Sequence, residues 1–104
     1  MAEQFRTDPD ESESAAALKS YSKLAVGQAN LFADRNLPTQ AEQTYRIATE
    51  IFPGNVEATT GLADLLARSG RAEDARRLVE EFLRKYPNRS RAIERWKSAT
   101  GPPE

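Results

Sequence analysis

The sequence predicts an all-α fold of about five helices, arranged as two antiparallel helix–turn–helix units followed by a capping helix. Two observations carry this prediction. Residues 22–55 align with residues 56–89 without a gap, so the chain repeats itself with a period of 34 residues. Apolar residues also recur every three or four positions in both units, the spacing of helices that bury one face, and no strand pattern appears.

The two units share residue types at matching places. Non-identical pairs keep their roles, since Phe52 and Tyr86 are both aromatic, and Asn36 and Gly70 both tolerate a left-handed backbone. The repeat is therefore interpreted as structural. Six aligned pairs are identical: Gly27/Gly61, Ala29/Ala63, Leu31/Leu65, Ala33/Ala67, Ala41/Ala75 and Pro53/Pro87.

We call the first helix of each unit its inner helix and the second its outer helix. The first inner helix is expected to begin in the N-terminal tail and to end near Arg35. Asp8 resembles an N-cap, with Pro9 inside the helix start and Glu11 able to reach back to it. The alternative is that residues 1–13 form an acidic tail outside the helix. Both interpretations of residues 1–13 remain open from the sequence.

The remaining helices follow from their start and stop signals. Asn36 and Gly70 suit left-handed caps, and Pro38 suits the first position of the helix that carries Ala41 to Phe52. The second unit has an inner helix over about 56–69. Its outer helix carries the apolar residues from Ala75 to Tyr86, with the negative charges of Glu73 and Asp74 in its first turn.

A third helical segment begins near Ser90 and stops before the Gly-Pro-Pro at 101–103. We interpret it as a capping helix whose Ile93 and Trp96 cover Phe82 and Tyr86. The predicted organisation is a folded domain over 14–99, with repeat 1 at 22–55, repeat 2 at 56–89, the cap at 90–99 and a short tail at 100–104.

Composition excludes several classes of function. The chain has no cysteine and no histidine, so it lacks thiol nucleophiles, thiolate metal sites and the commonest general base. Its net charge is −1, and no apolar stretch is long enough to cross a bilayer. The opening residues do not form a secretory signal. We therefore expect a soluble, cytoplasmic protein that is not an enzyme and needs neither cofactor nor metal.

The pattern resembles the tetratricopeptide repeat, whose signature is W-x2-L-G-x2-Y, then A-x3-F, then P. The second unit matches at Thr59, Leu62, Ala63, Leu66, Ala75, Val79 and Pro87. The first unit matches at Ala25, Gln28, Ala29, Phe32, Ala41, Tyr45 and Pro53. Ala25 and Thr59 depart from the large aromatic, and Gln28 departs from an apolar residue. The resemblance implies a short right-handed α-solenoid with a concave groove lined by the inner helices.

By this resemblance, the chain is a protein–protein interaction module that binds a peptide or helix of a partner protein in the groove. The partner's identity does not follow from the residues. The groove residues that the resemblance implies come from the two inner helices and the cap: Lys23, Val26, Gly27, Asn30, Asp34, Glu57, Thr60, Gly61, Asp64, Arg68, Arg91 and Arg95.

Two further readings concern these residues. Gly27 and Gly61 lie inside helices, where glycine is unfavourable, so either a ligand or a neighbouring helix needs the space.

Asn30, Arg91 and Arg95 form part of the clamp with which one branch of the family binds the C-terminal carboxylate of chaperone peptides. Val26 and Gly61 replace two other members of that clamp, so we rank this role below general peptide binding.

An alternative function is assembly. Repeat arrays usually need about three units, and this chain has two and a cap, so the N-terminal helix with Leu18 and Tyr21 could pack on a second copy or on upstream repeats.

The charge of the C-terminal part bears on nucleic-acid binding. Residues 68–97 hold ten basic and five acidic side chains. Because i,i+4 pairs explain this mixture, we do not expect a nucleic-acid partner.

Overall fold

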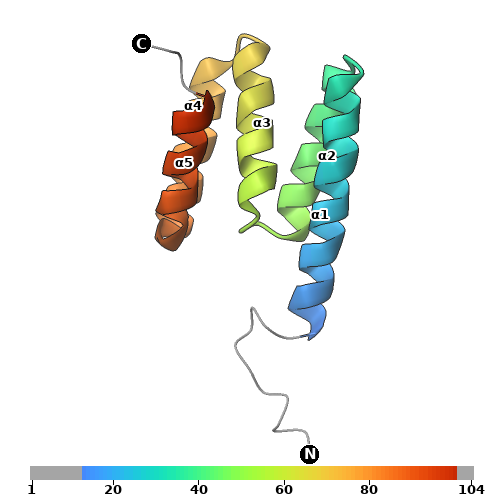
Figure 1. Cartoon of the computed structure of the whole chain (residues 1–104), viewed down its shortest axis with the longest axis vertical. Helices are drawn as coiled ribbons and strands as arrows, with labels where there is room; N and C mark the ends of the chain where they lie inside the picture. Colours follow the sequence, from blue (N-terminus) through green and yellow to red (C-terminus); the bar gives the residue numbers. More distant parts are fainter. Residues whose placement is uncertain (1–12, 101–104) are drawn as a thin grey trace, which may run out of the picture.

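The computed structural model describes residues 13–100, which are helical throughout except for short turns. No strand occurs in these residues, which confirms the all-α prediction. The elements, shown in Figure 1, are α1 (Glu13–Asp34), α2 (Pro38–Ile51), α3 (Val56–Arg68), α4 (Ala72–Lys85), the 3-10 helix η3 (Pro87–Arg89) and α5 (Ser90–Thr100).

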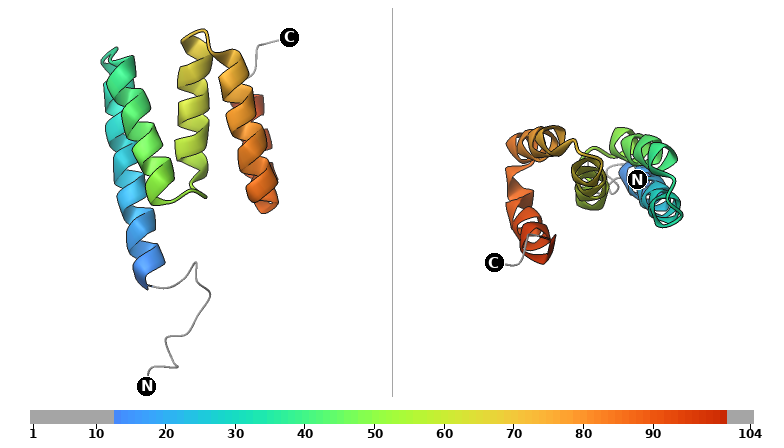
Figure 2. Two further views of the ribbon diagram at one scale, coloured as in Figure 1. Left: turned by 180° about the vertical axis from the view of Figure 1, so that it is seen from behind. Right: turned by 90° about the horizontal axis from the view of Figure 1, so that it is seen from above.

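The helices form two antiparallel hairpins and a cap. Helix α1 packs along α2, and α3 packs along α4, while α3 also contacts α1, α2 and α5. Seen along the helices, α1, α3 and α5 lie on one side of the array and α2 and α4 on the other (Figure 2). The predicted stack of helical repeats is therefore confirmed. The predicted helix start at Asp8, Pro9 and Glu11 lies outside the described residues.

The turns within the two hairpins have the predicted chemistry. Asn36 has φ 62° and Gly70 has φ 82°, so both adopt the left-handed backbone that ends a helix. Pro38 is the first residue of α2, where its missing N–H costs nothing. Glu73 and Asp74 lie in the first turn of α4, at the positive end of its dipole.

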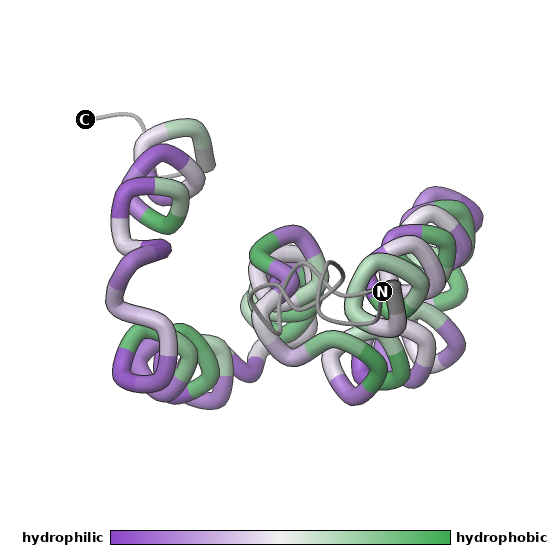
Figure 3. Tube along the Cα trace, turned by 90° about the horizontal axis from the view of Figure 1, so that it is seen from below, coloured by the Kyte–Doolittle hydropathy of each residue, from purple (hydrophilic) through white to green (hydrophobic). Residues whose placement is uncertain are grey.

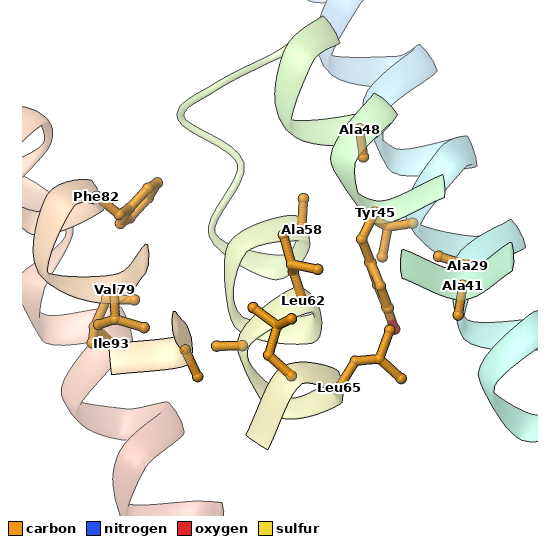
Figure 4. Packing of buried hydrophobic residues seen from close by; sticks show 14 residues of the cluster. Ala29, Ala41, Tyr45, Ala48, Ala58, Leu62, Leu65, Val79, Phe82 and Ile93 are labelled. Atoms are coloured by element: carbon orange, nitrogen blue, oxygen red, sulfur yellow. The ribbon is translucent and has the colours of Figure 1, made fainter. Parts of the chain in front are cut away.

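The core lies between the hairpins. Ala29, Ala41 and Ala48 are fully buried, which lets α1 and α2 approach closely. Figure 4 shows Tyr45 projecting from α2 towards α3, where Leu62 and Leu65 lie. The cluster continues through Val79 and Phe82 of α4 to Ile93 of α5, so one core joins both hairpins and the cap.

A buried polar network fixes where α3 begins. Ser22 is fully buried on α1, and its hydroxyl donates to the carbonyl of Ala48 on α2 at 2.8 Å. The Nδ2 of Asn55 donates to Ser22 Oγ at 2.7 Å, and its Oδ1 accepts from the backbone N–H of Ala58 at 3.2 Å. Asn55 is therefore an N-cap that also ties α3 to the first hairpin.

The cap contributes to the shared core and also reaches α3. Ile93 is fully buried in the cluster that contains Phe82, and Tyr86 and Trp96 pack against this cluster. The indole N–H of Trp96 donates to Asp64 Oδ2 of α3 at 3.2 Å. This bond, which the sequence did not predict, brings a groove-side carboxylate under the cap.

A charged link between the hairpins predicts acid sensitivity. Arg71, just before α4, donates to Glu42 of α2 at 2.8 Å, and this bond, together with Arg46, holds the pKa of the Glu42 carboxyl below its usual range. A depressed pKa stabilises the fold at pH values above the unfolded pKa, and this contribution is lost as the pH falls through the folded value. Urea unfolding should therefore show a small stability loss for Glu42→Gln near neutral pH.

That difference should shrink as the pH falls through the lowered pKa of Glu42, because the wild-type carboxyl is then protonated as well. Glu50→Gln, which changes an exposed glutamate on the same helix, serves as the control and should behave as the wild type does. A Glu42→Gln defect that persisted at acid pH would contradict the link.

Candidate partner-binding groove

A hollow of about 500 Å³ lies between α1 and α3, and Tyr45 of α2 also lines it. Both inner helices supply its walls, because residues three or four apart share one face of each helix. Its lining residues are Val26, Asn30, Ala33 and Asp34 of α1, Tyr45 of α2, and Glu57, Thr60, Gly61, Asp64 and Arg68 of α3.

The structure brings together eight of the twelve residues that the sequence assigned to the groove. Among these eight, Val26 is buried at 6% exposure and forms part of the core as much as of the wall. The eight are Val26, Asn30, Asp34, Glu57, Thr60, Gly61, Asp64 and Arg68.

The other four assigned residues lie elsewhere. Lys23 lines a neighbouring hollow of about 470 Å³, which shares Glu57 with the groove. Gly27 is exposed on α1, and Arg91 and Arg95 are exposed on α5, but none of the three lines either hollow.

The two helical glycines have different surroundings in the structure. A Cβ added to Gly61 would lie 2.5 Å from Cε1 of the Tyr45 ring, so the space at Gly61 is used by a side chain of the same molecule. A Cβ added to Gly27 would meet nothing within 4 Å. Close packing therefore explains Gly61, whereas no contact within the described residues explains Gly27.

Tyr45 is a groove residue that the sequence analysis assigned to the repeat signature and not to the groove. Its ring is buried at 4% exposure, and its hydroxyl donates to Oδ1 of Asn30 at the groove wall. Burial raises the pKa of the Tyr45 phenol; Arg68 opposes this shift, and Asp64 and Asp34 add to it. The phenol therefore stays neutral, and its bond holds the side-chain oxygen of Asn30 at the groove wall.

The groove carries an excess of negative charge. Asp34, Glu57 and Asp64 line it, against the single guanidinium of Arg68. Asp34 and Glu57 are exposed, and Asp64 is half-buried beneath Trp96. A surface of this kind attracts ammonium and guanidinium groups and repels carboxylates.

The neighbouring hollow has a different character. Its floor includes Phe52 and Val56, and the Lys19 ammonium lies 5.4 Å from the centroid of the Phe52 ring, within cation–π range. Because Glu57 lines both spaces, the apolar hollow continues from the end of the acidic groove. Together they form one surface with an acidic part and an apolar part.

Two classes of site are missing from the part of the chain that the structure describes. Within residues 13–100, no group of three or more acidic side chains lies close enough to hold a metal ion. No helix in that range is both long and apolar enough to span a membrane.

Comparison with known proteins agrees with this architecture. The family model described as Tetratricopeptide repeat matches residues 26–90, which include most of both hairpins. No curated protein and no solved structure matches the chain significantly. Proteins built from this repeat are generally protein–protein interaction modules and are typically non-catalytic. The 34-residue period, the stacked hairpins and the matching model together show that the chain belongs to the tetratricopeptide repeat family.

Proposed function

We propose that this chain is a non-catalytic interaction module whose groove between α1 and α3 binds a basic segment of a partner protein. The observation that carries the proposal is the lining of the groove, where three carboxylates face one guanidinium around the paired side chains of Tyr45 and Asn30. Lysine or arginine side chains of the segment would pair with Asp34 and Glu57. The NH2 group of Asn30 would donate to a carbonyl of its backbone.

The apolar hollow beside the groove supports binding of a segment rather than of a single side chain. Its exposed lining is mostly apolar, with Phe52 at its floor, so it suits an apolar residue that follows the basic ones. A short groove of two inner helices buries little area, and we expect micromolar affinity at best.

A carboxylate ligand of the chaperone-tail kind receives less support. Of the residues that would form the clamp, Arg91 and Arg95 do not line the hollow, which leaves Asn30 as the one clamp residue at the groove. The remaining charge at the groove is negative and would repel a terminal carboxylate.

Peptide selection tests the groove proposal. Peptides of about twelve residues, selected from a random displayed library against the wild-type protein, should be enriched in lysine and arginine. Their NMR shift changes should centre on Asn30 and Gly61. The double charge reversal Asp34→Lys with Glu57→Lys should weaken binding by roughly tenfold or more, because each reversal replaces attraction by repulsion.

The matched control is Glu80→Lys, which reverses an exposed charge on α4, outside the groove. It should leave binding within about twofold of the wild type. Selected peptides that lacked basic residues, or whose affinity did not respond to the groove variant, would overturn the proposal.

A second candidate function is assembly through α1. Four large apolar side chains of this helix are exposed: Leu18 at 44%, Tyr21 at 59%, Leu24 at 70% and Leu31 at 52%. A single exposed leucine is ordinary, but several along one helix favour contact with another protein surface. This role does not use the groove and is compatible with it.

A further inference from the structure

The acidic groove and the apolar hollow beside it carry charges of opposite sign. Lys19 and Lys23 of α1 line the hollow together with the carboxylate of Glu57, whereas carboxylates outnumber cations in the groove. The hollow is lined by the first half of α1 and the start of α3, and the groove extends along the second half of α1 and the rest of α3. The combined surface therefore has a positive end at the two lysines and a negative end at Asp34.

The charges at the two ends of this surface are not paired with each other or with neighbouring side chains. Between the side chains of residues 14–99, every ion pair joins residues of α2, α4 or the turn that precedes α4. Lys19, Lys23, Asp34 and Glu57 belong to none of these pairs. Figure 3, which looks along the helices, shows hydrophilic segments on both α1 and α3, the two walls of the surface. These charges are therefore open to a partner.

We propose that the partner segment is extended and bipolar, with a basic part, an apolar residue and an acidic side chain in that order along the surface. The basic part pairs with Asp34 and Glu57, and the apolar residue lies in the hollow against Phe52. The acidic side chain pairs with Lys19 and Lys23 through charge-assisted hydrogen bonds. A wholly basic segment would instead place positive charge against both ammonium groups. The inference rests on the proposed function of the groove and specifies the chemistry of its ligand.

The length of α1 between its charges sets their spacing in the segment. From Asp34 to Lys23 and to Lys19, α1 covers about 16 and 22 Å. An extended chain advances about 3.3 Å per residue, so the basic and acidic residues should be about five to seven positions apart. An α-helix about 10 Å wide and 16 Å long fills roughly 1,200 Å³. The groove holds about 500 Å³, so it suits an extended chain.

The position of the lysines along α1 favours an acidic side chain over a C-terminal carboxylate. Helix α1 extends from Lys19 back to Glu13, a further 9 Å or about that. A bound segment has room to continue along α1 beyond the two ammonium groups. Its acidic group is therefore assigned to a residue inside the segment.

Peptide selection against two proteins tests the order of charges. The probe is a random displayed library of about twelve residues, flanked on both sides by carrier sequence so that no peptide has a free terminus. Peptides selected on the wild type should carry Asp or Glu about five to seven positions from Lys or Arg, with an apolar residue between them. Peptides selected on the double variant Lys19→Glu with Lys23→Glu should carry a basic residue at the formerly acidic position.

The affinity of one peptide selected on the wild type measures the effect. Lys19→Glu with Lys23→Glu should weaken its binding by roughly tenfold or more, and exchange of the peptide's acidic residue for lysine should restore most of the loss. The matched control is Lys85→Glu with Lys97→Glu, which changes the net charge equally at exposed positions of α4 and α5 that line neither space. It should leave binding within about twofold of the wild type. Circular dichroism of each variant shows that it is folded.

The results distinguish failure of the bipolar segment from failure of the groove. Basic peptides that respond to Asp34→Lys with Glu57→Lys but carry no acidic residue at this spacing overturn the bipolar segment, and the proposed function stands. An affinity that the lysine variant leaves unchanged, or a loss that the exchanged peptide does not restore, overturns the bipolar segment in the same way. Selected peptides without basic residues overturn both.

Discussion

Replacing Tyr45 by alanine is expected to lower the free energy of unfolding by about 3 to 5 kcal/mol, as for other buried aromatic residues. Tyr45 is 4% exposed and bridges the two hairpins, because its ring lies against Gly61 of α3 and its hydroxyl donates to Asn30 of α1. Removing the ring opens a cavity where α1, α2 and α3 meet. Urea unfolding, followed by circular dichroism and by the fluorescence of Trp96, measures the loss.

Two further variants serve as controls. One removes only the hydroxyl of Tyr45, and the other truncates a tyrosine that is exposed. Tyr45→Phe removes only the bond to Asn30 and should cost about 1 kcal/mol. Tyr21→Ala makes the same truncation at a site that is 59% exposed, and in dilute protein it should stay within about 0.5 kcal/mol of the wild type. Equal losses for Tyr45→Ala and Tyr21→Ala would contradict the bridging role.

Local signals in the sequence were sufficient for the helices and turns. Asn36, Gly70 and Pro38 act on the backbone within a few residues of themselves, so their effects do not depend on distant packing. The repeat added the arrangement of the hairpins, because two units with matching apolar faces bury them in the same way. This is why the fold class and the groove walls on α1 and α3 were both predictable.

Contacts between distant side chains were not predictable in this way. The bonds from Asn55 to Ser22 and from Trp96 to Asp64 join residues more than thirty positions apart, and no pattern in the sequence links their polar atoms. The contact of Tyr45 with Gly61 did have a signal. Ala41 and Tyr45 of the A-x3-F element are both buried on α2, and the Tyr45 ring reaches Gly61 on the inner helix of the next unit.

The placement of Gly27 shows where reasoning from the repeat alone fails. Equivalence to Gly61 suggested one role for both glycines, but the two units differ in their neighbours. The second unit is covered by the first, whereas no described residue covers the first. The same backbone position therefore serves internal packing on α3 and lies on an open surface on α1.

Alanine at the two helical glycines should accordingly change stability in opposite directions. Gly61→Ala is expected to lower the free energy of unfolding by about 1 to 3 kcal/mol, because its Cβ would lie 2.5 Å from the buried ring of Tyr45, which has little space to move. Gly27→Ala should raise it by about 0.5 to 1 kcal/mol in dilute protein, since alanine favours the helix and its Cβ meets nothing within 4 Å. Thermal and urea unfolding of the two variants measure both effects.

The pair also has an internal control. If the clash with the ring causes the loss in Gly61→Ala, then adding Tyr45→Ala should remove it, and the double variant should be no less stable than Tyr45→Ala alone. The Gly27→Ala gain should be the same with or without Tyr45. Two results would contradict this explanation. One is a stability loss from Gly61→Ala that persists in the Tyr45→Ala background, and the other is a stability loss from Gly27→Ala in dilute protein. Either would mean that contact with the Tyr45 ring does not explain the difference between the two glycines.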